Sequence, residues 1–383
     1  MTSNTLIPPG LEGVVAATTR LSHVDGEAGE LIIAGFPIGE LAANATFEET
    51  TWLLWHGALP TRAELDAFGA SVAAQRELPS PTFEILRACA AERVDPMDAL
   101  RMAIGTVSLV SCDAEVILAL APTIVAAYAR LAAVKAPIAP RADLGHAANY
   151  LYMLDGVEPD AERVRALETY LNTVVDHGLN ASTFTCRVII STGSDLVSAV
   201  AGAVGALKGP LHGGAPGPAL ETVFEIGDAS RAETVLRAKI EAGERLMGFG
   251  HRVYKVRDPR ADVLAAAAER LFTRAGDMQL YTLARHVERT AVALLEEYKP
   301  GRRLQTNVEF YTALVLHGLG LDVGLFTPTF AISRVSGWIA HAIEQRAANR
   351  LIRPTSEYVG PRGRRWPGRG GAAPEADGET ALR

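Results

Sequence analysis

The hydrophobic and polar positions of this chain follow a helical period over most of its length, from about Thr46 onward. The segment FEETTWLLWHG is typical: Thr46 is a good N-cap, Glu49 stands three residues later as in a capping box, and Gly57 is a plausible stop. A second helix is expected to begin after Leu59-Pro60-Thr61. Repetition of this pattern predicts a mainly α protein.

The residues before this helical part have a different pattern. Thr18, Thr19 and Val24-Asp25-Gly26 lead to Leu31-Ile32-Ile33, which places β-prone residues around a Gly-bearing turn. We therefore expect one small β-hairpin ahead of the helices.

Two strongly apolar segments are expected to be buried helices. The uncharged run 116–129 is closed by Glu115 and Arg130, contains Pro122, and is too short to span a bilayer. The run 196–207 is rich in Ala, Gly and Val, so neighbouring backbones can approach it closely, and we expect it to be fully buried. Neither segment therefore indicates a membrane protein.

Composition and charge narrow the classes of function. Hydrophobic residues make up 48% of the chain but aromatic residues only 6%, so the interior must be built mostly from Ala, Leu and Val. The net charge of -7 repels a phosphate backbone, which argues against a nucleic-acid partner.

Cysteine usage and the two ends of the chain bear on location. Cys89, Cys112 and Cys186 lie far apart without metal-ligand spacing, as expected for reduced thiols that fill small core spaces in cytosol. The first residues, MTSNTLIPPG, lack the basic start and apolar stretch of an export signal, so we expect a cytoplasmic protein. Residues 362–383 carry too few apolar side chains to order, and we expect a disordered tail.

Two histidines are bracketed by glycines. His212 stands on a turn in LKGPLHGGAPG, and His251 stands in MGFGHRVYK. The helix before His251 is expected to begin at Ser230, with Glu233 completing a capping box, and to end within MGFG. Such turns hold an imidazole where a ligand can approach, although they also occur in ordinary loops. The other histidines outside the segment around His177 are expected to be structural: His23, His56, His146, His286, His317 and His341.

Cationic residues accompany His251. The segment from Arg252 to Arg260 is basic and interrupted by proline, which favours an anionic ligand. The alternative is a solvated loop in which Asp258 pairs with Arg260 at the surface, where the pair would contribute little. Arg334 lies in the mostly apolar helix FAISRVSGW, where an unpaired guanidinium is costly, so we expect an acid or a ligand beside it.

Glu309 in TNVEFYTALVLHG is a third candidate. Thr306-x-x-Glu309 is itself a capping box, and spacing alone favours a capping role for the carboxylate. A metal site built from His212, His251 and Glu309 is conceivable, but no HExxH or HxH spacing supports it, and we predict no metal.

These residues are part of a longer set of motifs. LKGPLHGGA, GFGHRVYKVRDPR, TNVEFY, the segment DHGLNAST from Asp176 to Thr183, and RLIRPTSEYVGP resemble the citrate synthase family in their order and spacing. The resemblance runs from about Leu11 to Pro361 and includes the hairpin SHVDGEAGELI. A combination that is so long and so ordered is highly specific.

The resemblance implies a role for each matching position. His212 matches the histidine that hydrogen-bonds the acetyl-CoA thioester carbonyl, His251 matches the one that polarises the oxaloacetate ketone, and Glu309 falls where the general base sits. His177 matches a further substrate-contacting histidine. The remaining positions match arginines that hold substrate carboxylates and backbone that cradles the CoA adenine: Arg260, Arg334 and Arg353, and Met247, Gly248, Phe249 and Gly250.

The chemistry agrees with these roles. Removing a proton beside a thioester places negative charge on one oxygen, so a donor at that oxygen and a carboxylate at the carbon are both needed. If His212 opens the helix that follows it, the helix dipole would disfavour its protonation and leave a neutral donor. A dicarboxylate suits the planar, permanently charged forks of three arginines.

Several positions depart from the family pattern. The family base is usually Asp, whereas Glu309 is one methylene longer, and a catalytic atom misplaced by about an ångström can cost on the order of a hundredfold in rate. The other departures lie outside the chemical core: Asp176-His177-Gly178, Gly213-Gly214-Ala215-Pro216, Asp95-Pro96-Met97 and Ala34-Gly35. They bear on substrate preference more than on reaction type.

The resemblance also implies an architecture and a set of ligands. We expect a large helical domain from residues 1–212 and 321–361, a small helical domain from 213–320, and a homodimer in which Arg353 reaches the neighbouring site. No permanently bound cofactor is expected, because acetyl-CoA is a co-substrate. The predicted function is condensation of acetyl-CoA with oxaloacetate. The alternatives are a 2-methylcitrate synthase that uses propionyl-CoA, and a catalytically inactive helical dimer that binds CoA or a tricarboxylate.

Overall fold

The computed structural model describes residues 8–213, 216–364 and 366 of the 383-residue chain. Residues 1–351 form one compact unit and residues 352–383 form a second. Most of the predicted tail, residues 367–383, lies outside the described residues, as does the pair 214–215.

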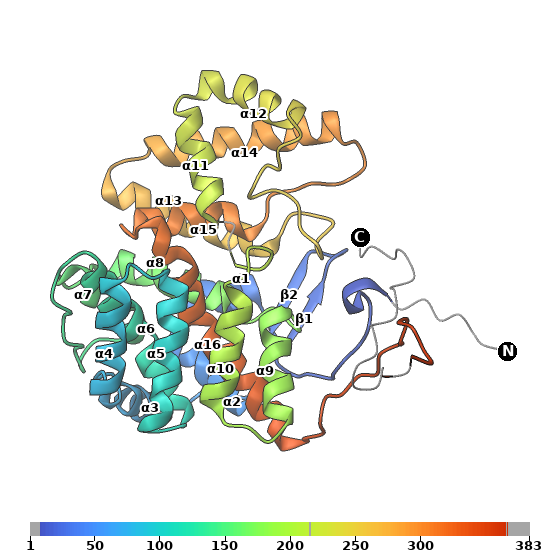
Figure 1. Ribbon diagram of the computed structural model, residues 1–383. Helices are drawn as coiled ribbons and strands as arrows, with labels where there is room; N and C mark the ends of the chain where they lie inside the picture. The colour runs from blue at the N-terminus through green and yellow to red at the C-terminus, as the bar shows by residue number, and fades with distance from the viewer. Residues whose placement is uncertain (1–7, 214–215, 365, 367–383) are drawn as a thin grey trace. The chain divides into compact units, whose positions relative to one another are not determined.

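The described residues are mainly helical, which confirms the predicted fold class (Figure 1). The α-helices of the first half of the chain are α1 (Ile38–Asn44), α2 (Phe47–His56), α3 (Arg62–Ala74), α4 (Ser80–Ala91), α5 (Pro96–Thr106), α6 (Ala114–Ala132), α7 (His146–Asp155), α8 (Ala161–Val174) and α9 (Ala181–Ser191). Those of the second half are α10 (Leu196–Leu207), α11 (Pro216–Ile226), α12 (Ala232–Glu241), α13 (Pro259–Ala275), α14 (Gln279–Tyr298), α15 (Val308–Gly318) and α16 (Phe326–Ala347). Short 3-10 turns are η1 (Pro9–Leu11), η2 (Val107–Leu109), η3 (Ala229–Arg231) and η4 (Val323–Leu325).

The predicted hairpin is present, and it carries a third short strand that the sequence did not indicate. Strand β1 (Ser22–Asp25) pairs antiparallel with β2 (Glu30–Ile33), with Ser22 opposite Ile33. Strand β2 pairs in turn with β3 (Phe36–Pro37). β3 has only two residues, so it is too short to show the alternation by which a strand is recognised.

The first helices begin where the capping signals place them. In α2, the Thr46 side chain accepts the Glu49 amide and Glu49 returns to the Thr46 backbone, which completes the predicted capping box, and Gly57 is the C-cap. Thr61 and Glu64 form a second capping box at the start of α3. Reciprocal capping satisfies amides that no helix can satisfy internally.

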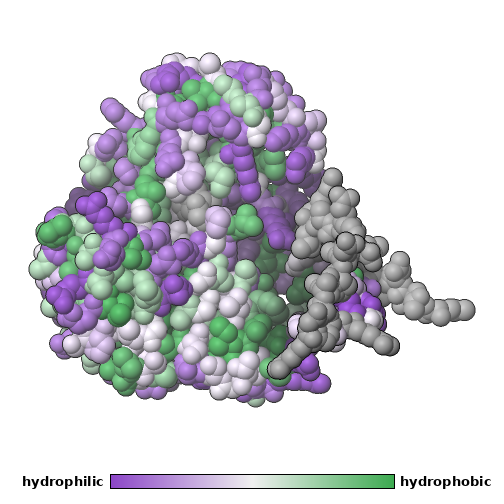
Figure 2. All heavy atoms as spheres, in the orientation of Figure 1, coloured by the Kyte–Doolittle hydropathy of each residue, from purple (hydrophilic) through white to green (hydrophobic). Residues whose placement is uncertain are grey.

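Helix α6 lies in the core, as predicted, but it is longer than the uncharged run. Ala114 to Ala132 form 19 helical residues, so by length and composition α6 is long enough to cross a membrane, and so is the bent pair Val308–Gly318 with Val323–Ala347. However, 67% of the apolar window of α6 is buried inside the protein. On the face shown in Figure 2, hydrophilic and hydrophobic residues are interspersed. The burial fits a core helix.

The expectation that the segment 196–207 is fully buried is wrong. It forms α10, which packs against α5, α9 and α16 through Leu196, Val200 and Val204 among others. Ser198 and Gly205 lie exposed because these neighbours cover only one side of the helix. The cysteine prediction is likewise confirmed only in part: Cys89 and Cys186 are buried, whereas Cys112 is exposed in the loop before α6.

The helix before His251 is much shorter than predicted. Asp228, not Ser230, supplies the cap, by accepting the Ser230 amide at the start of η3, and α12 ends at Glu241. The chain leaves the helix at Gly243, whose φ of 77° is left-handed and suits glycine. Residues 244–258 are consequently a long loop, which leaves the backbone around His251 free to shape a site.

Helices α11 to α15 pack on one another, through contacts such as α12 with α14 and α13 with α15, and α13 joins them to α1 and α8 (Figure 1). This group falls within the predicted small domain, but the boundaries of the two domains stay a prediction.

Helix α16 approaches the end of α8 and the residues that follow it unusually closely. The Ser333 hydroxyl donates to the Leu171 carbonyl, and a Cβ added at Gly337 would lie 2.2 Å from the Val175 oxygen. No real Cβ tolerates that distance, so Gly337 is what allows the contact. The segment held in this way continues into His177.

Replacing Gly337 with Ala should therefore separate α16 from this segment. We expect the free energy of unfolding to fall by about 1 to 3 kcal/mol, the usual cost of overpacking. Gly69→Ala is the matched control, because Gly69 lies within α3 with nothing within 4 Å of its added Cβ. That variant should gain about 0.5 to 1 kcal/mol from helix propensity. Chemical denaturation of both variants checks the prediction, and an unchanged Gly337→Ala would contradict it.

The turn of the hairpin packs against the loop that carries His251. The Lys255 amide donates to the Gly26 carbonyl over 2.8 Å. A Cβ added at Gly26 would lie 2.2 Å from the Val253 oxygen, so only glycine fits there. The first β-turn of the chain thus supports a loop more than two hundred positions later in the sequence.

Candidate active site

Seven segments supply the side chains of the candidate site. His177 follows α8, His212 stands on the turn between α10 and α11, and His251 stands in the loop 244–258. The remaining groups come from the first turns of α9, α13 and α15 and from the middle of α16, in the order Ser182, Arg260, Glu309 and Arg334.

His212 is held by the start of α9. Its Nε2 accepts the Ser182 amide over 3.3 Å and lies 2.8 Å from the Ser182 hydroxyl, which also accepts from the Trp338 indole. Burial, with Arg334 as the second cause, lowers the pKa of His212 to about 4. A neutral ring whose Nε2 is an acceptor carries its proton on Nδ1, so Nδ1–H is the ring's remaining donor.

The neutral state of His212 was predicted, but the cause given for it was wrong. Helix α11 begins at Pro216, so His212 does not open it. Desolvation and a neighbouring guanidinium, rather than a helix dipole, keep this imidazole uncharged.

His251 is fixed by its own turn. Its Nδ1 accepts the amides of Val253, over 3.0 Å, and Tyr254, over 3.1 Å. Burial, and then Arg260, lowers the pKa of His251 to about 4. With Nδ1 occupied as an acceptor, the neutral ring must carry its proton on Nε2. The Arg260 Nη2 atom lies 3.4 Å from Nε2, so this donor sits beside a cation.

Arg260 pairs with Asp258, as one of the two interpretations of this segment expected, but the pair is buried rather than exposed. Asp258 caps α13 by accepting the Arg260 amide, and it holds the guanidinium at 2.8 Å; only 5% and 0% of the two side chains are exposed. The aspartate outweighs burial and raises the pKa of Arg260. Burying two charges costs free energy, so a buried pair is expected where it holds a charged group in a position that a ligand needs.

Arg334 is a buried cation with no carboxylate partner within ion-pair distance among the described residues. Its Nε donates to the Val174 carbonyl over 2.7 Å, and its guanidinium lies over the Phe330 ring. Burial lowers its pKa to about 10, although the charge of Asp176 opposes this shift. The expected acid is therefore not in contact, and the terminal nitrogens are available to an anion.

Glu309 is not a capping residue, which corrects the interpretation that spacing favoured. The N-cap of α15 is Asn307, whose Oδ1 accepts the Glu309 amide over 3.0 Å. The carboxylate therefore does not cap the helix, although its side chain has a hydrogen bond with Asn307. Burial raises the pKa of Glu309 to about 6, with Arg260 and Arg245 acting in the opposite direction. A carboxylate with a pKa near neutrality is suited to general-base catalysis.

The backbone from Met247 to Gly250 lies against the residues that lead into α15. The Asn307 amide donates to the Gly248 carbonyl, the Gly250 amide donates to Gln305, and Asn307 Nδ2 donates to the Gly250 carbonyl over 2.8 Å. Asn307 thus both caps Glu309's helix and fixes this strand-like segment. Whether the segment cradles a CoA adenine stays a prediction.

His177 lies beside His251, and a tyrosine that sequence reasoning missed contacts both. The ring centroids of the two histidines are 5.7 Å apart, and the Tyr254 hydroxyl lies 3.1 Å from His177 Nε2. Burial, Arg260, His251 and Arg334 together lower the pKa of His177 well below its usual value. Tyr254 carried no signal of its own, because a tyrosine in a basic loop resembles any other partly buried aromatic residue.

His341 is structural, as predicted, and it acts next to the site. It lies fully buried in α16, where Nδ1 accepts from Arg187 over 2.9 Å and Nε2 donates to Asp176 over 3.1 Å. Asp176 also accepts the Ser22 hydroxyl of β1. This network anchors the residue that precedes His177.

Six of the predicted side chains lie close enough for their charges to interact: His177, His212, His251, Arg260, Glu309 and Arg334. Arg334 acts on the pKa values of His177 and His212, and Arg260 acts on those of His251 and Glu309. Among the described residues, no three His, Cys, Asp or Glu side chains are grouped to hold a metal ion. Arg353 belongs to the second unit, so its proposed contact with a neighbouring site stays a prediction.

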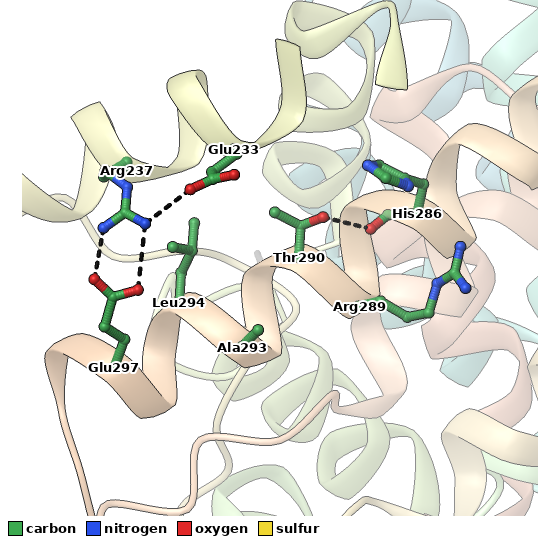
Figure 3. Close-up of a pocket in the computed structure, with 8 residues that line it drawn as sticks. All are labelled: Glu233, Arg237, His286, Arg289, Thr290, Ala293, Leu294 and Glu297. Atoms are coloured by element: carbon green, nitrogen blue, oxygen red, sulfur yellow. Dashed lines mark hydrogen bonds and ion pairs between the residues drawn. The ribbon is translucent and has the colours of Figure 1, made fainter. Parts of the chain in front are cut away.

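Two adjoining surface cavities lie along α14, away from these residues. One of about 520 Å³ is lined by Arg237, Glu233 and Glu297 at one end, where the arginine bridges both acids (Figure 3). At its other end, His286 and Arg289 are shared with an adjoining cavity of about 800 Å³. Neither cavity includes a residue of the candidate site, and we assign them no role.

Comparison with known sequences finds one family along nearly the whole chain. Residues 10–355 match the family model described as citrate synthase, C-terminal domain. A citrate synthase of Haloferax volcanii is 42% identical over 92% of this chain and 95% of its own length. A 2-methylcitrate synthase of Mycobacterium tuberculosis is 40% identical over 94% of this chain and 93% of its own length.

Solved structures show the same similarity. The citrate synthase of Pyrobaculum aerophilum superimposes with a TM-score of 0.85 and 39% identity, over 93% of each chain. That of Thermoplasma acidophilum, described as a ternary complex with carboxymethyl coenzyme A and oxaloacetate, gives a TM-score of 0.84 and 30% identity, over 93% of this chain and 97% of that one.

Proposed function

This chain belongs to the citrate synthase family and is an enzyme of the acyltransferase type, and on that premise we propose that it condenses acetyl-CoA with oxaloacetate to give citrate and free CoA. The observation that carries the proposal is the combination of a buried, near-neutral carboxylate at Glu309 with two uncharged imidazoles and two buried guanidinium groups. That set matches the needs of carbon–carbon bond formation between an acyl thioester and a dianion.

The first chemical step is removal of a methyl proton from acetyl-CoA. Glu309 takes the proton, and the Nδ1–H of His212 donates to the thioester oxygen as negative charge moves onto it. Because both imidazole and carboxylate are desolvated, the donor and the base act on the substrate without competing water. The product of this step is an enol.

The second step is attack of the enol carbon on the ketone of oxaloacetate. The Nε2–H of His251 donates to the ketone oxygen as it becomes an alkoxide, and the adjacent Arg260 guanidinium stabilises the same charge. Arg260, Arg334 and His177 hold the dicarboxylate, with Arg334 offering nitrogens that no carboxylate of the described residues occupies. Water then cleaves the citryl thioester and releases CoA.

Other parts of the proposal rest on the family. CoA is a co-substrate rather than a resident cofactor, and backbone from Met247 to Gly250 is proposed to receive its adenine. A homodimer with Arg353 completing the neighbouring site, and a cytoplasmic location, also belong to the proposal. The similarity to citrate synthases and to 2-methylcitrate synthases at about the same identity supports the statements about CoA and the dimer, whereas the location rests on the spacing of the cysteines.

A second candidate is a 2-methylcitrate synthase, and the relative from Mycobacterium tuberculosis favours it. Propionyl-CoA adds one methylene to the acyl group, which changes binding by only about 1 to 3 kcal/mol. Glu309 in place of the usual Asp alters the space beside the acyl carbon, so it bears on this choice. The third candidate is a catalytically inactive dimer that binds CoA or a tricarboxylate.

Thiol release with oxaloacetate and each acyl-CoA separates these functions. We expect acetyl-CoA to give a kcat/KM about 10- to 200-fold above that of propionyl-CoA, the range that one methylene can produce. The measurement is continuous detection of free CoA at matched substrate concentrations. The reverse ratio would establish the 2-methylcitrate activity, and release with neither substrate would leave the inactive binder.

A further inference from the structure

Tyr254 contacts three members of the candidate oxaloacetate subsite. Its hydroxyl lies 3.1 Å from His177 Nε2, its ring lies 4.8 Å from the His251 ring, and the Arg260 guanidinium lies over its face at 5.8 Å. Only 2% of the residue is exposed. A side chain that only filled space would not need its polar atom aimed at a substrate-contacting histidine.

The same residue orients both histidines. Its backbone amide donates to His251 Nδ1, which fixes the proton of that ring on Nε2. Its hydroxyl lies within hydrogen-bond distance of Nε2 of His177, so it helps to set the plane of that ring. Burial raises the pKa of Tyr254, so the phenol stays a neutral hydrogen-bonding group.

The loop that carries Tyr254 is itself held rigidly. The Lys255 amide bonds to Gly26 in the hairpin, and Asp258 at the end of the loop caps α13 and accepts the Val308 amide. A side chain that positions its neighbour must itself be fixed by its surroundings, because its effect depends on geometry held within a fraction of an ångström.

We propose that Tyr254 is a positioning residue that sets the orientation of His177 through its hydroxyl and thereby determines how tightly the oxaloacetate subsite holds its dicarboxylate. This inference rests on the proposed function and assigns a role to a residue outside the predicted site. Tyr254 acts through His177 and need not touch the substrate.

The test is Tyr254→Phe, which removes the oxygen and leaves the ring. We expect KM for oxaloacetate to rise about three- to tenfold, the effect of one neutral hydrogen bond, while KM for acyl-CoA stays unchanged. Titration calorimetry should show the same loss in oxaloacetate affinity. In a His177→Ala background, Tyr254→Phe should change affinity less than about twofold, because the group it acts through is gone.

Tyr150→Phe is the matched control. Tyr150 is also fully buried, and its hydroxyl bonds to Thr329 over 2.9 Å, away from the site. It should leave both KM values unchanged. If Tyr254→Phe behaves like this control, or if it weakens oxaloacetate equally with and without His177, the proposal is overturned.

A spectroscopic readout keeps the test independent of turnover. In protein with nitrogen-15-labelled histidine, the side-chain resonances of His177 should shift in Tyr254→Phe and not in Tyr150→Phe. No shift would refute the positioning role even if the wild-type chain proved inactive. Absence of thiol release from wild type, with the shift present, would count against the proposed reaction alone.

Discussion

Replacing Glu309 with Gln is expected to lower kcat by about a hundredfold to ten-thousandfold, with oxaloacetate affinity preserved. The amide cannot accept the methyl proton, and general-base catalysis typically contributes a factor of this size. In the wild-type enzyme, kcat/KM should rise with pH through about 6, because only the ionised carboxylate is a base. His212 and His251, with pKa values of about 4, are already neutral in this range.

The sign of this pH dependence is fixed by the raised pKa. Below pH 6 Glu309 is increasingly protonated, so kcat/KM should fall about tenfold per pH unit. The variant should lose this acid limb along with most of its rate. Glu297→Gln is the control. Glu297 lies exposed on α14 and forms an ion pair with Arg237, so this variant should leave kcat unchanged. A Glu309→Gln enzyme that retains near-normal kcat would remove Glu309 from the mechanism.

Replacing Arg334 with Met should raise KM for oxaloacetate by about 30-fold to several thousandfold, since truncating one partner of a buried charge pair costs about 2 to 5 kcal/mol. The loss should appear in oxaloacetate binding, because the terminal nitrogens of Arg334 have no carboxylate partner within ion-pair distance in the described part of the chain. Lysine should not restore binding, because it cannot present a planar fork.

Stability distinguishes this role from a structural one. Methionine fills much of the same space and removes the cost of a buried charge, which offsets the lost hydrogen bond to the Val174 carbonyl, so Arg334→Met should be about as stable as wild type. Arg76 is the control: it is equally buried, but its Nη1 atom donates to the Arg141 and Leu144 carbonyls. Arg76→Met should lower the denaturation midpoint and leave KM unchanged. A destabilised Arg334→Met with normal KM would contradict the assignment.

The fold was predictable where local chemistry decides it. Helix α2 begins at a reciprocal cap between Thr46 and Glu49, and the hairpin forms around a Gly-bearing turn, both of which are interactions of near neighbours in sequence. The end of α12 was not predictable in the same way, because Gly243 competes with Gly248 and Gly250 as a stop and only the packed structure decides between them. Exposure of Ser198 on α10 likewise depends on which side its neighbours cover.

Some features of the site were likewise readable from the sequence, and others depend on contacts between remote segments. Resemblance to the family located His212, His251 and Glu309, and the structure places them in one electrostatic neighbourhood. Asn307 as the true cap could have been found, because an asparagine directly before an apolar helix is a standard N-cap. The partners of His177 and His341 could not, because Tyr254 and Asp176 reach them through contacts between segments remote in sequence.

The bond between the hairpin turn and the loop of His251 limits how this enzyme can be redesigned. Gly26 accepts the Lys255 amide and leaves no room for a side chain under Val253. Grafting the 251–260 loop of a relative with another substrate would therefore fail unless the turn at residues 25–30 were transplanted with it. Residues 25–30 and 251–260 depend on each other structurally, so a change of specificity requires exchanging both together.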